Sequence, residues 1–128
     1  MSTLSEILLS QISYGQKYLP YDGTNPNFAS TAHKGNGYYG LSDGMHTVSV
    51  SLQGFRGELR FQGSLMLEPT AADWFDLNDS NAQLVQFGDI VTPTSGTFFA
   101  NLPGNLVWFR ASVTNFQAGV ISKVLYTT

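Results

Sequence analysis

Alternation of apolar and polar residues over residues 46–67 constrains this chain more than any other feature. Val48, Val50 and Leu52 share one face of an extended strand, and the intervening threonine and serine residues share the other. After a short glycine-containing stretch, residues 57–67 alternate again, with apolar side chains at 59, 61, 65 and 67. Two such runs joined by a short loop are typical of a β-hairpin with one buried face.

Further apolar runs follow at regular intervals along the chain. Pro103-Gly104 is interpreted as the turn of a second tight hairpin, and residues 115–119 as the turn before a last strand. Seven strands with no long helix between them predict an all-β fold, namely an antiparallel β-sandwich or jelly roll. The additional candidate strands are residues 74–77, 83–87, 97–102, 105–114 and 120–127.

The first 45 residues follow a different pattern. Thr3 and Glu6 match a capping box, and four apolar residues then recur at helical spacing, which predicts a short helix over residues 4–13. Residues 14–45 contain five tyrosines and no periodicity, as expected of a long irregular arm rather than of plain disorder. We therefore divide the chain into an N-terminal helix and assembly arm, residues 1–45, and a β-sandwich domain, residues 46–128. The arm is expected to lie across the same or an adjacent subunit.

Charged residues make up only 12% of the chain, which is about half the usual share for a soluble domain. Six basic and nine acidic residues give a net charge of −3, so we expect no nucleic-acid partner. No apolar run approaches the roughly 20 residues of a membrane helix, so no membrane partner is expected either. The absence of cysteine excludes disulfides and thiolate metal sites.

Two of the predicted strands carry apolar residues on both faces, which a sandwich strand does not need. Either the N-terminal segment covers the outer face, or another chain does. Protein interfaces are poor in charge and rich in aromatic residues, as this sequence is. The candidate interface residues are Leu4, Ile7, Leu8, Ile12, Tyr14, Tyr18, Tyr21, Leu106, Trp108 and Tyr126.

The sequence offers no catalytic constellation, and we expect no enzymatic activity, no cofactor and no metal site. His33 and His46 lack the spacing of a shared metal site or of a nucleophile and its base. Aromatic residues are the remaining binding candidates, because their rings stack on sugars in β-sandwich carbohydrate-binding modules. Tyr38 and Tyr39 are the best candidates for an exposed pair. Trp74 is a further candidate for stacking on a sugar, although packing in a core or interface is the favoured explanation for it.

The β-rich part resembles a family through an ordered series of loose motifs. These are Phe55-x-Gly57-x-Leu59-x-Phe61-x-Gly63-x-Leu65, then Pro69, Trp74-Phe75 and Gly96-x-Phe98, then Gly104-Asn105-Leu106-Val107-Trp108-Phe109-Arg110-Ala111, and finally Gly119-x-Ile121-x-Lys123-Val124-Leu125-Tyr126. The series is similar to that of small β-sandwich virion proteins of tailed bacteriophages, particularly those with contractile tails. It covers roughly residues 46–127, and residues 1–45 have no counterpart.

The resemblance implies a non-enzymatic component of the virion that assembles in symmetric copies. Capsid decoration, neck, baseplate and fibre are all compatible with it. The implied partners are copies of the same chain and other virion proteins. The alternative function is a carbohydrate-binding β-sandwich module that recognises a receptor or other glycan through Tyr38, Tyr39 and Trp74.

Overall fold

The structure, a computed structural model, describes residues 5–39, 44–79 and 81–127. These residues form one antiparallel sheet of nine strands that does not close on itself, together with two 3-10 helices, η1 (Asn36–Tyr39) and η2 (Ala71–Asp73). The predicted all-β, antiparallel class is therefore confirmed. The strands are β1 (Ser5–Leu9), β2 (Ile12–Ser13), β3 (Phe28–Ala29), β4 (His33–Lys34), β5 (Met45–Ser64), β6 (Phe75–Asp76), β7 (Gln86–Phe87), β8 (Thr94–Pro103) and β9 (Trp108–Thr127).

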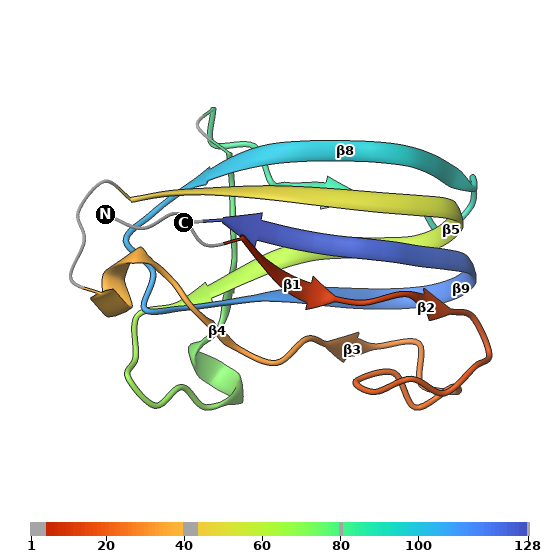
Figure 1. The fold of residues 1–128 in the computed structure, drawn as a ribbon, viewed down its shortest axis with the longest axis horizontal. Coiled ribbons are helices and arrows are strands. Elements are labelled where there is room, and N and C mark those ends of the chain that lie inside the picture. Colours follow the sequence, from red (N-terminus) through yellow and green to blue (C-terminus); the bar gives the residue numbers. More distant parts are fainter. Residues whose placement is uncertain (1–4, 40–43, 80, 128) are drawn as a thin grey trace.

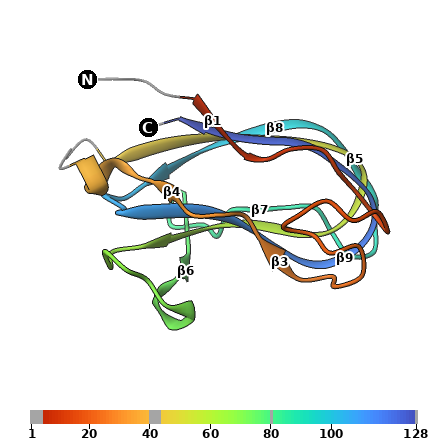
Figure 2. The same cartoon turned by 60° about the horizontal axis from the view of Figure 1, so that its bottom comes forward.

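Two strands of 20 residues each, β5 and β9, form the axis of the sheet. They pair along their whole length and bend near their middles, so that the sheet folds over into two facing halves (Figure 1 and Figure 2). The upper half in Figure 2 holds β1, β2 and β8, which pair with residues 45–55 of β5 and 120–127 of β9. The lower half holds β3 and β4, which pair with residues 108–113 of β9, and β6 and β7, which pair with residues 59–63 of β5.

The two turns predicted within these strands are wrong. Residues 54–56 and 115–119 are bends in continuous strands, because each half of β5 keeps the same partner, β9, on both sides of the bend. At this bend the register between β5 and β9 shifts twice, once between Gln53 and Arg56 and once between Arg56 and Glu58. In β5 the buried positions are even-numbered before the bend and odd-numbered after it, as an inserted bulge residue requires. The inner face therefore stays continuous around the bend.

Two glycines allow the long strands to bend side by side. Gly54 has φ +59° and Gly119 has φ +90°, a region that other residues adopt only with strain. A Cβ on Gly119 would overlap the carbonyl oxygen of Gly54 and lie 2.6 Å from the Phe55 nitrogen. The backbones of β5 and β9 are thus in close contact here, and only glycine fits at position 119.

Aromatic rings fill the space between the two halves of the sheet. His46 from the upper half stacks on Phe109 from the lower half, with centroids 5.3 Å apart and an interplanar angle of 8°. Phe109 also stacks on Phe61 at 5.7 Å and on Tyr126 at 5.0 Å. At the bend, Phe116 lies 5.2–6.0 Å from four further rings, which belong to Tyr14, Tyr21, Phe28 and Phe55.

The N-terminal segment forms strands, and the predicted helix over residues 4–13 is wrong for the described part of that range. β1 and β2 pair with the C-terminal part of β9. The register of β1 shifts between Ile7 and Leu9, which buries Leu8 and Leu9 together. A bulged strand thus produces the same close apolar spacing that a helix would, and pairing with β9 decides between them. Residue 4 lies outside the described residues.

The rest of the arm also lies on its own chain. β3 pairs with residues 112–113 of β9, and β4 pairs with residues 108–109. Residues 5–34 thus supply the edge of both halves of the sheet on the β9 side (Figure 1).

The remaining short strands and β8 lie on the β5 side of the sheet. The strands predicted at 74–77 and 83–87 are present as the two-residue strands β6 and β7. The hairpin predicted at Pro103-Gly104 is wrong, because β8 pairs with β5 and not with β9. The chain instead crosses there from the upper half to the lower half. Among the described residues, no helix has the length and apolar character needed to cross a membrane.

Candidate functional site

The structure separates the ten candidate interface residues into distinct environments. Leu8, Ile12, Tyr21, Leu106 and Tyr126 lie buried in the core of their own chain, where their side chains are not available to a partner. The exposed candidates are Ile7, Tyr14 and Tyr18; Trp108 is half-buried, and Leu4 lies outside the described residues.

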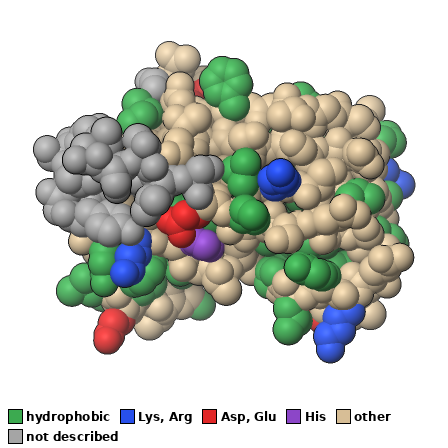
Figure 3. All heavy atoms as spheres, viewed as in Figure 1, with side chains coloured by type: hydrophobic (Ala, Val, Ile, Leu, Met, Phe, Trp, Pro, Cys, Tyr) green, Lys and Arg blue, Asp and Glu red, His purple; other side chains and the backbone are tan. Residues whose placement is uncertain are grey.

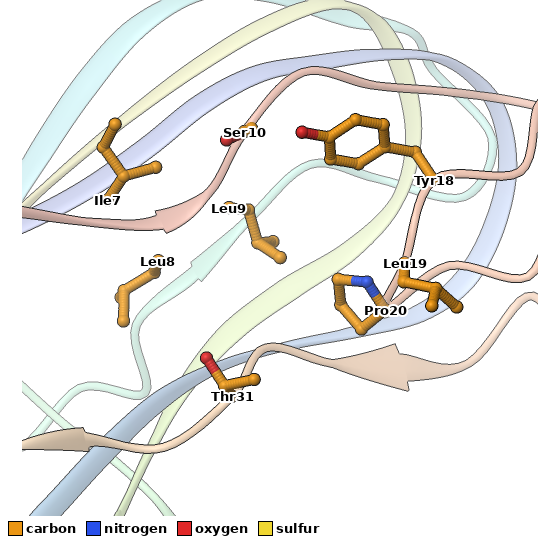
Figure 4. A pocket seen from close by; sticks show the side chains of 8 residues that line it. All are labelled: Ile7, Leu8, Leu9, Ser10, Tyr18, Leu19, Pro20 and Thr31. Carbon is orange, nitrogen blue, oxygen red and sulfur yellow. The ribbon is translucent and has the colours of Figure 1, made fainter.

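The exposed candidates Ile7 and Tyr18 line an apolar hollow on the β9 side of the molecule. The hollow has a volume of about 380 Å³ and lies between β1 and the loop that carries Tyr18 (Figure 4). Most of the side chains in its walls are apolar, and Ser10 and Thr31 are polar. The complete lining is Ile7, Leu8, Leu9, Ser10, Tyr18, Leu19, Pro20 and Thr31.

A polar clasp at one end of β1 joins it to β4 in the lower half. The Nδ1 of His33 lies 3.1 Å from Oε1 of Glu6 and donates a hydrogen bond to it. The Tyr126 hydroxyl lies 2.8 Å from Oε2 of the same carboxylate and 2.9 Å from the Lys34 carbonyl oxygen. Burial alone would raise the pKa of Glu6, but the hydrogen bonds from His33 and Tyr126 outweigh it, and the pKa lies below its ordinary value. The clasp therefore holds Glu6 as a carboxylate.

The outer face of the lower half carries a cluster of aromatic side chains. Tyr38, at the end of η1, lies 5.2 Å from Trp108 between ring centroids and is 40% exposed. The ammonium group of Lys34 lies 4.5 Å from the centre of the Tyr38 ring. The Trp108 indole N–H donates a hydrogen bond of 2.8 Å to the Leu67 carbonyl oxygen. The rings of Tyr38 and Trp108 thus form one half-exposed aromatic surface at the start of β9.

A ladder of polar side chains continues from this aromatic surface along the same face. The guanidinium of Arg110 lies 4.2 Å from the centre of the Trp74 ring, and its Nε donates to Gln62 at 2.9 Å. Gln62 in turn donates to Asp76 at 3.0 Å. Arg60 lies 3.5 Å from the other oxygen of Asp76. Burial lowers the pKa of Arg110, although an arginine remains charged at any physiological pH.

These groups define the aromatic–polar face, made of Tyr38, Arg60, Gln62, Trp74, Asp76, Trp108 and Arg110. Aromatic rings beside amide, carboxylate and guanidinium groups are able to stack on a sugar ring and bind its hydroxyls. The structure therefore places Tyr38 and Trp74, two of the three predicted glycan-binding residues, on the same face. The side chain of Tyr39 lies outside the described set.

The polar members of this face were missed by sequence reasoning, apart from the observation that charges are rare. Alternation from 58 to 62 placed Arg60 and Gln62 on the polar side of a strand, which indicates only a solvated face. Their meeting with Trp74 and Asp76 depends on the pairing of β6 with residues 62–63 of β5. Among the described residues, no group of three or more potential ligands is placed to hold a metal ion.

Comparisons with protein-family models, with curated proteins and with solved structures found no match to this chain.

Proposed function

We propose that this chain is a non-enzymatic structural subunit of a bacteriophage virion, with a β-sandwich or jelly-roll-like fold, that binds copies of itself and neighbouring virion proteins. The observation that carries this proposal is a surface rich in apolar side chains and poor in charge. Fourteen large hydrophobic side chains of the described residues are exposed. Figure 3 shows one face of the molecule, on which charged side chains are few and scattered.

The exposed apolar side chains are partly contiguous, and this distinguishes them from the isolated ones that any protein surface carries. Leu65, Met66 and Leu67 follow β5 as an unbroken apolar triplet, and they are 64%, 52% and 72% exposed. The triplet adjoins the aromatic–polar face, because the Leu67 carbonyl oxygen accepts the hydrogen bond from Trp108. An apolar surface of this kind is stabilised when a protein partner covers it.

The mass of the purified chain in solution tests the proposal. Light scattering over a wide range of concentrations should give masses above the 14.0 kDa of a single chain, rising towards a whole multiple of it as the concentration increases. Replacing Leu65 and Leu67 by serine should reduce the assembled fraction, whereas Leu84→Ser, at another exposed leucine, should leave it unchanged. A constant mass of 14.0 kDa at every concentration would contradict the proposal.

A second candidate function is binding of a saccharide, and the aromatic–polar face is the observation that favours it. Tyr38, Trp74 and Trp108 border a ladder of hydrogen-bonding side chains on one outer face of the sheet. A glycan array followed by calorimetry tests this function. Binding that is lost in Trp74→Ala but kept in Phe75→Ala, a neighbouring exposed aromatic, supports it, and an array without hits contradicts it.

A further inference from the structure

We propose that β8 is an open edge at which two copies of this chain join, pairing antiparallel around a two-fold axis near Phe99 so that the upper halves of their sheets become continuous. The inference rests on the proposed function, since it names a second copy as the partner and β8 as a surface of self-assembly in addition to the exposed triplet of residues 65–67. The four edges of the folded sheet differ in how well they are protected from pairing with another strand.

Three of the four edges carry features that prevent pairing with another strand. The edge formed by β1 is only five residues long, contains Glu6 and has a register shift. The edge formed by β3 and β4 consists of two-residue strands, and β4 contains a histidine and a lysine. The edge formed by β6 and β7 is equally short and contains Asp76. Short strands, charges and bulges are the usual protection of exposed edges.

The fourth edge, β8, carries such features only at its two ends, where the register shifts between Thr94 and Gly96 and where Pro103 ends the strand. It has ten residues, Thr-Ser-Gly-Thr-Phe-Phe-Ala-Asn-Leu-Pro, and none is charged. Its register with β5 is regular from Gly96 to Pro103. Within the described part of the chain β8 pairs with β5 alone, and the side-chain hydrogen bonds of Ser95, Thr97 and Asn101 also go to β5. In an antiparallel pair, alternate residues direct their N–H and C=O groups away from the partner, so the far side of β8 offers a row of backbone groups that no described strand pairs with.

The occupant that fits this edge is a second copy of the same strand. Free backbone groups in extended geometry are satisfied by another β-strand. Two-fold pairing places each residue of β8 near residues of its twin, which is unfavourable for a strand with charges of one sign. No charged residue lies between Asp89 and Arg110, so two copies of β8 pair without charge repulsion. A charged strand from another protein would find no opposite charge on β8 to pair with.

Phe99 makes the centre of β8 the expected position of the axis. Its side chain is 72% exposed on the outer face, where it borders a hollow of about 200 Å³ that is also lined by Ser49 and Leu125. Antiparallel pairing about this position brings the two Phe99 rings together across the axis. Their contact removes from water the largest exposed side chain of the strand.

The variant Phe99→Lys tests the proposal, with Val91→Lys as the matched control. Both residues are apolar and almost equally exposed, at 72% and 73%, but Val91 lies outside β8. Measured by sedimentation, Phe99→Lys should weaken self-association about tenfold or more, and Val91→Lys should not change it. Circular dichroism shows whether each variant is folded. If the full chain assembles but Phe99→Lys assembles equally well, this proposal fails and the proposed function stands; if the full chain is monomeric, both fail.

Engineered cysteines give a second test, because the natural chain has no cysteine. An equimolar mixture of Thr97→Cys, Phe99→Cys and Asn101→Cys contains a facing pair for any two-fold axis between residues 97 and 101. Mild oxidation should give disulfide-linked dimers in the mixture, since facing Cα atoms lie about 4.5–5.5 Å apart. Val91→Cys, the control, should assemble normally but form no disulfide-linked dimers under the same conditions. Absence of linked dimers in the mixture, or equal linking in the control, would overturn the proposal.

Discussion

The close contact of the two long strands at their bend leads to a prediction about two glycines. In Gly119→Ala the new methyl group overlaps the Gly54 carbonyl oxygen, so the backbone of β5 or β9 must move. In Gly54→Ala the methyl group meets nothing within 4 Å. Both residues have positive φ, +90° and +59°, so both variants place alanine in a strained conformation. The pair of variants separates the effect of the close contact from the effect of the conformation.

The expected magnitudes follow from these two effects. Alanine in a left-handed conformation costs about 1–2 kcal/mol, which is the whole expected effect of Gly54→Ala. Gly119→Ala has this cost and, in addition, about 1–3 kcal/mol for the shift of packed backbone. The free energy of unfolding should therefore fall by roughly 2–5 kcal/mol in Gly119→Ala, which is a large part of the 5–15 kcal/mol typical of a domain.

Urea unfolding followed by tryptophan fluorescence measures this difference. With a slope of about 2 kcal/mol per molar urea, the midpoint of Gly119→Ala should lie roughly 1 M below that of Gly54→Ala. Equal midpoints for the two variants would refute the account of the bend, because they would show that β5 and β9 are not in contact at these glycines.

Three further predictions concern the N-terminal strands, the bend cluster and the clasp. Deletion of residues 1–35 should abolish folding, observed as loss of β-sheet circular dichroism, because it removes four strands and the buried side chains of Leu8, Leu9, Ile12 and Tyr21; a folded truncated chain would contradict the pairing of these strands with β9. Phe116→Ala should lower the free energy of unfolding by about 3–5 kcal/mol in urea titrations, while the exposed Phe75→Ala should lower it by less than about 1 kcal/mol; similar losses would contradict the core assignment. Because the pKa of Glu6 is lower in the folded chain, its contribution to stability is present above the pKa of the unfolded chain and is lost as the pH falls through the lower folded value. Thermal unfolding of Glu6→Gln should thus depend less on acidic pH than that of the natural chain, and identical pH profiles would refute the role of the clasp.

Much of the strand content could be predicted from alternation, since alternation reports directly which side chains are buried. Val48, Val50, Leu52, Leu59 and Phe61 are all buried as predicted. Residues 65 and 67 continue the same pattern but are exposed, because β5 ends at residue 64 and the chain leaves the sheet. Alternation describes a local surface and does not show where a strand loses its partner.

The topology could not be predicted from local signals in the same way. A glycine with positive φ serves equally in a hairpin turn and in a bulge, and Gly54 and Gly119 are in bends within paired strands. Whether such a glycine forms a turn or a bend depends on the pairing of β5 with β9, two strands that lie about sixty residues apart in the sequence. The same long-range pairing converts the expected N-terminal helix into β1 and β2. Tertiary contacts overrode local propensity at each of these places.

The candidate site was predicted in part. Tyr38 and Trp74 were candidates because aromatic rings stack on sugars, and the structure places both on the aromatic–polar face. Trp108 was assigned to an interface and belongs to the same face. The contacts of Arg110 with Trp74 and Gln62 could not be predicted, because they depend on the sheet register. The open edge at β8 was not predicted, because a hairpin with the following strand had been assigned to it.

Amide hydrogen exchange measured at low and high protein concentration tests most directly whether this chain assembles through β8. Backbone N–H groups that point away from β5 exchange readily in a free edge and are protected once a second strand bonds to them. The account predicts that raising the concentration slows exchange within residues 94–102 and leaves the amides of β1 unchanged. Slower exchange elsewhere with no change in β8, or exchange independent of concentration throughout, would contradict it.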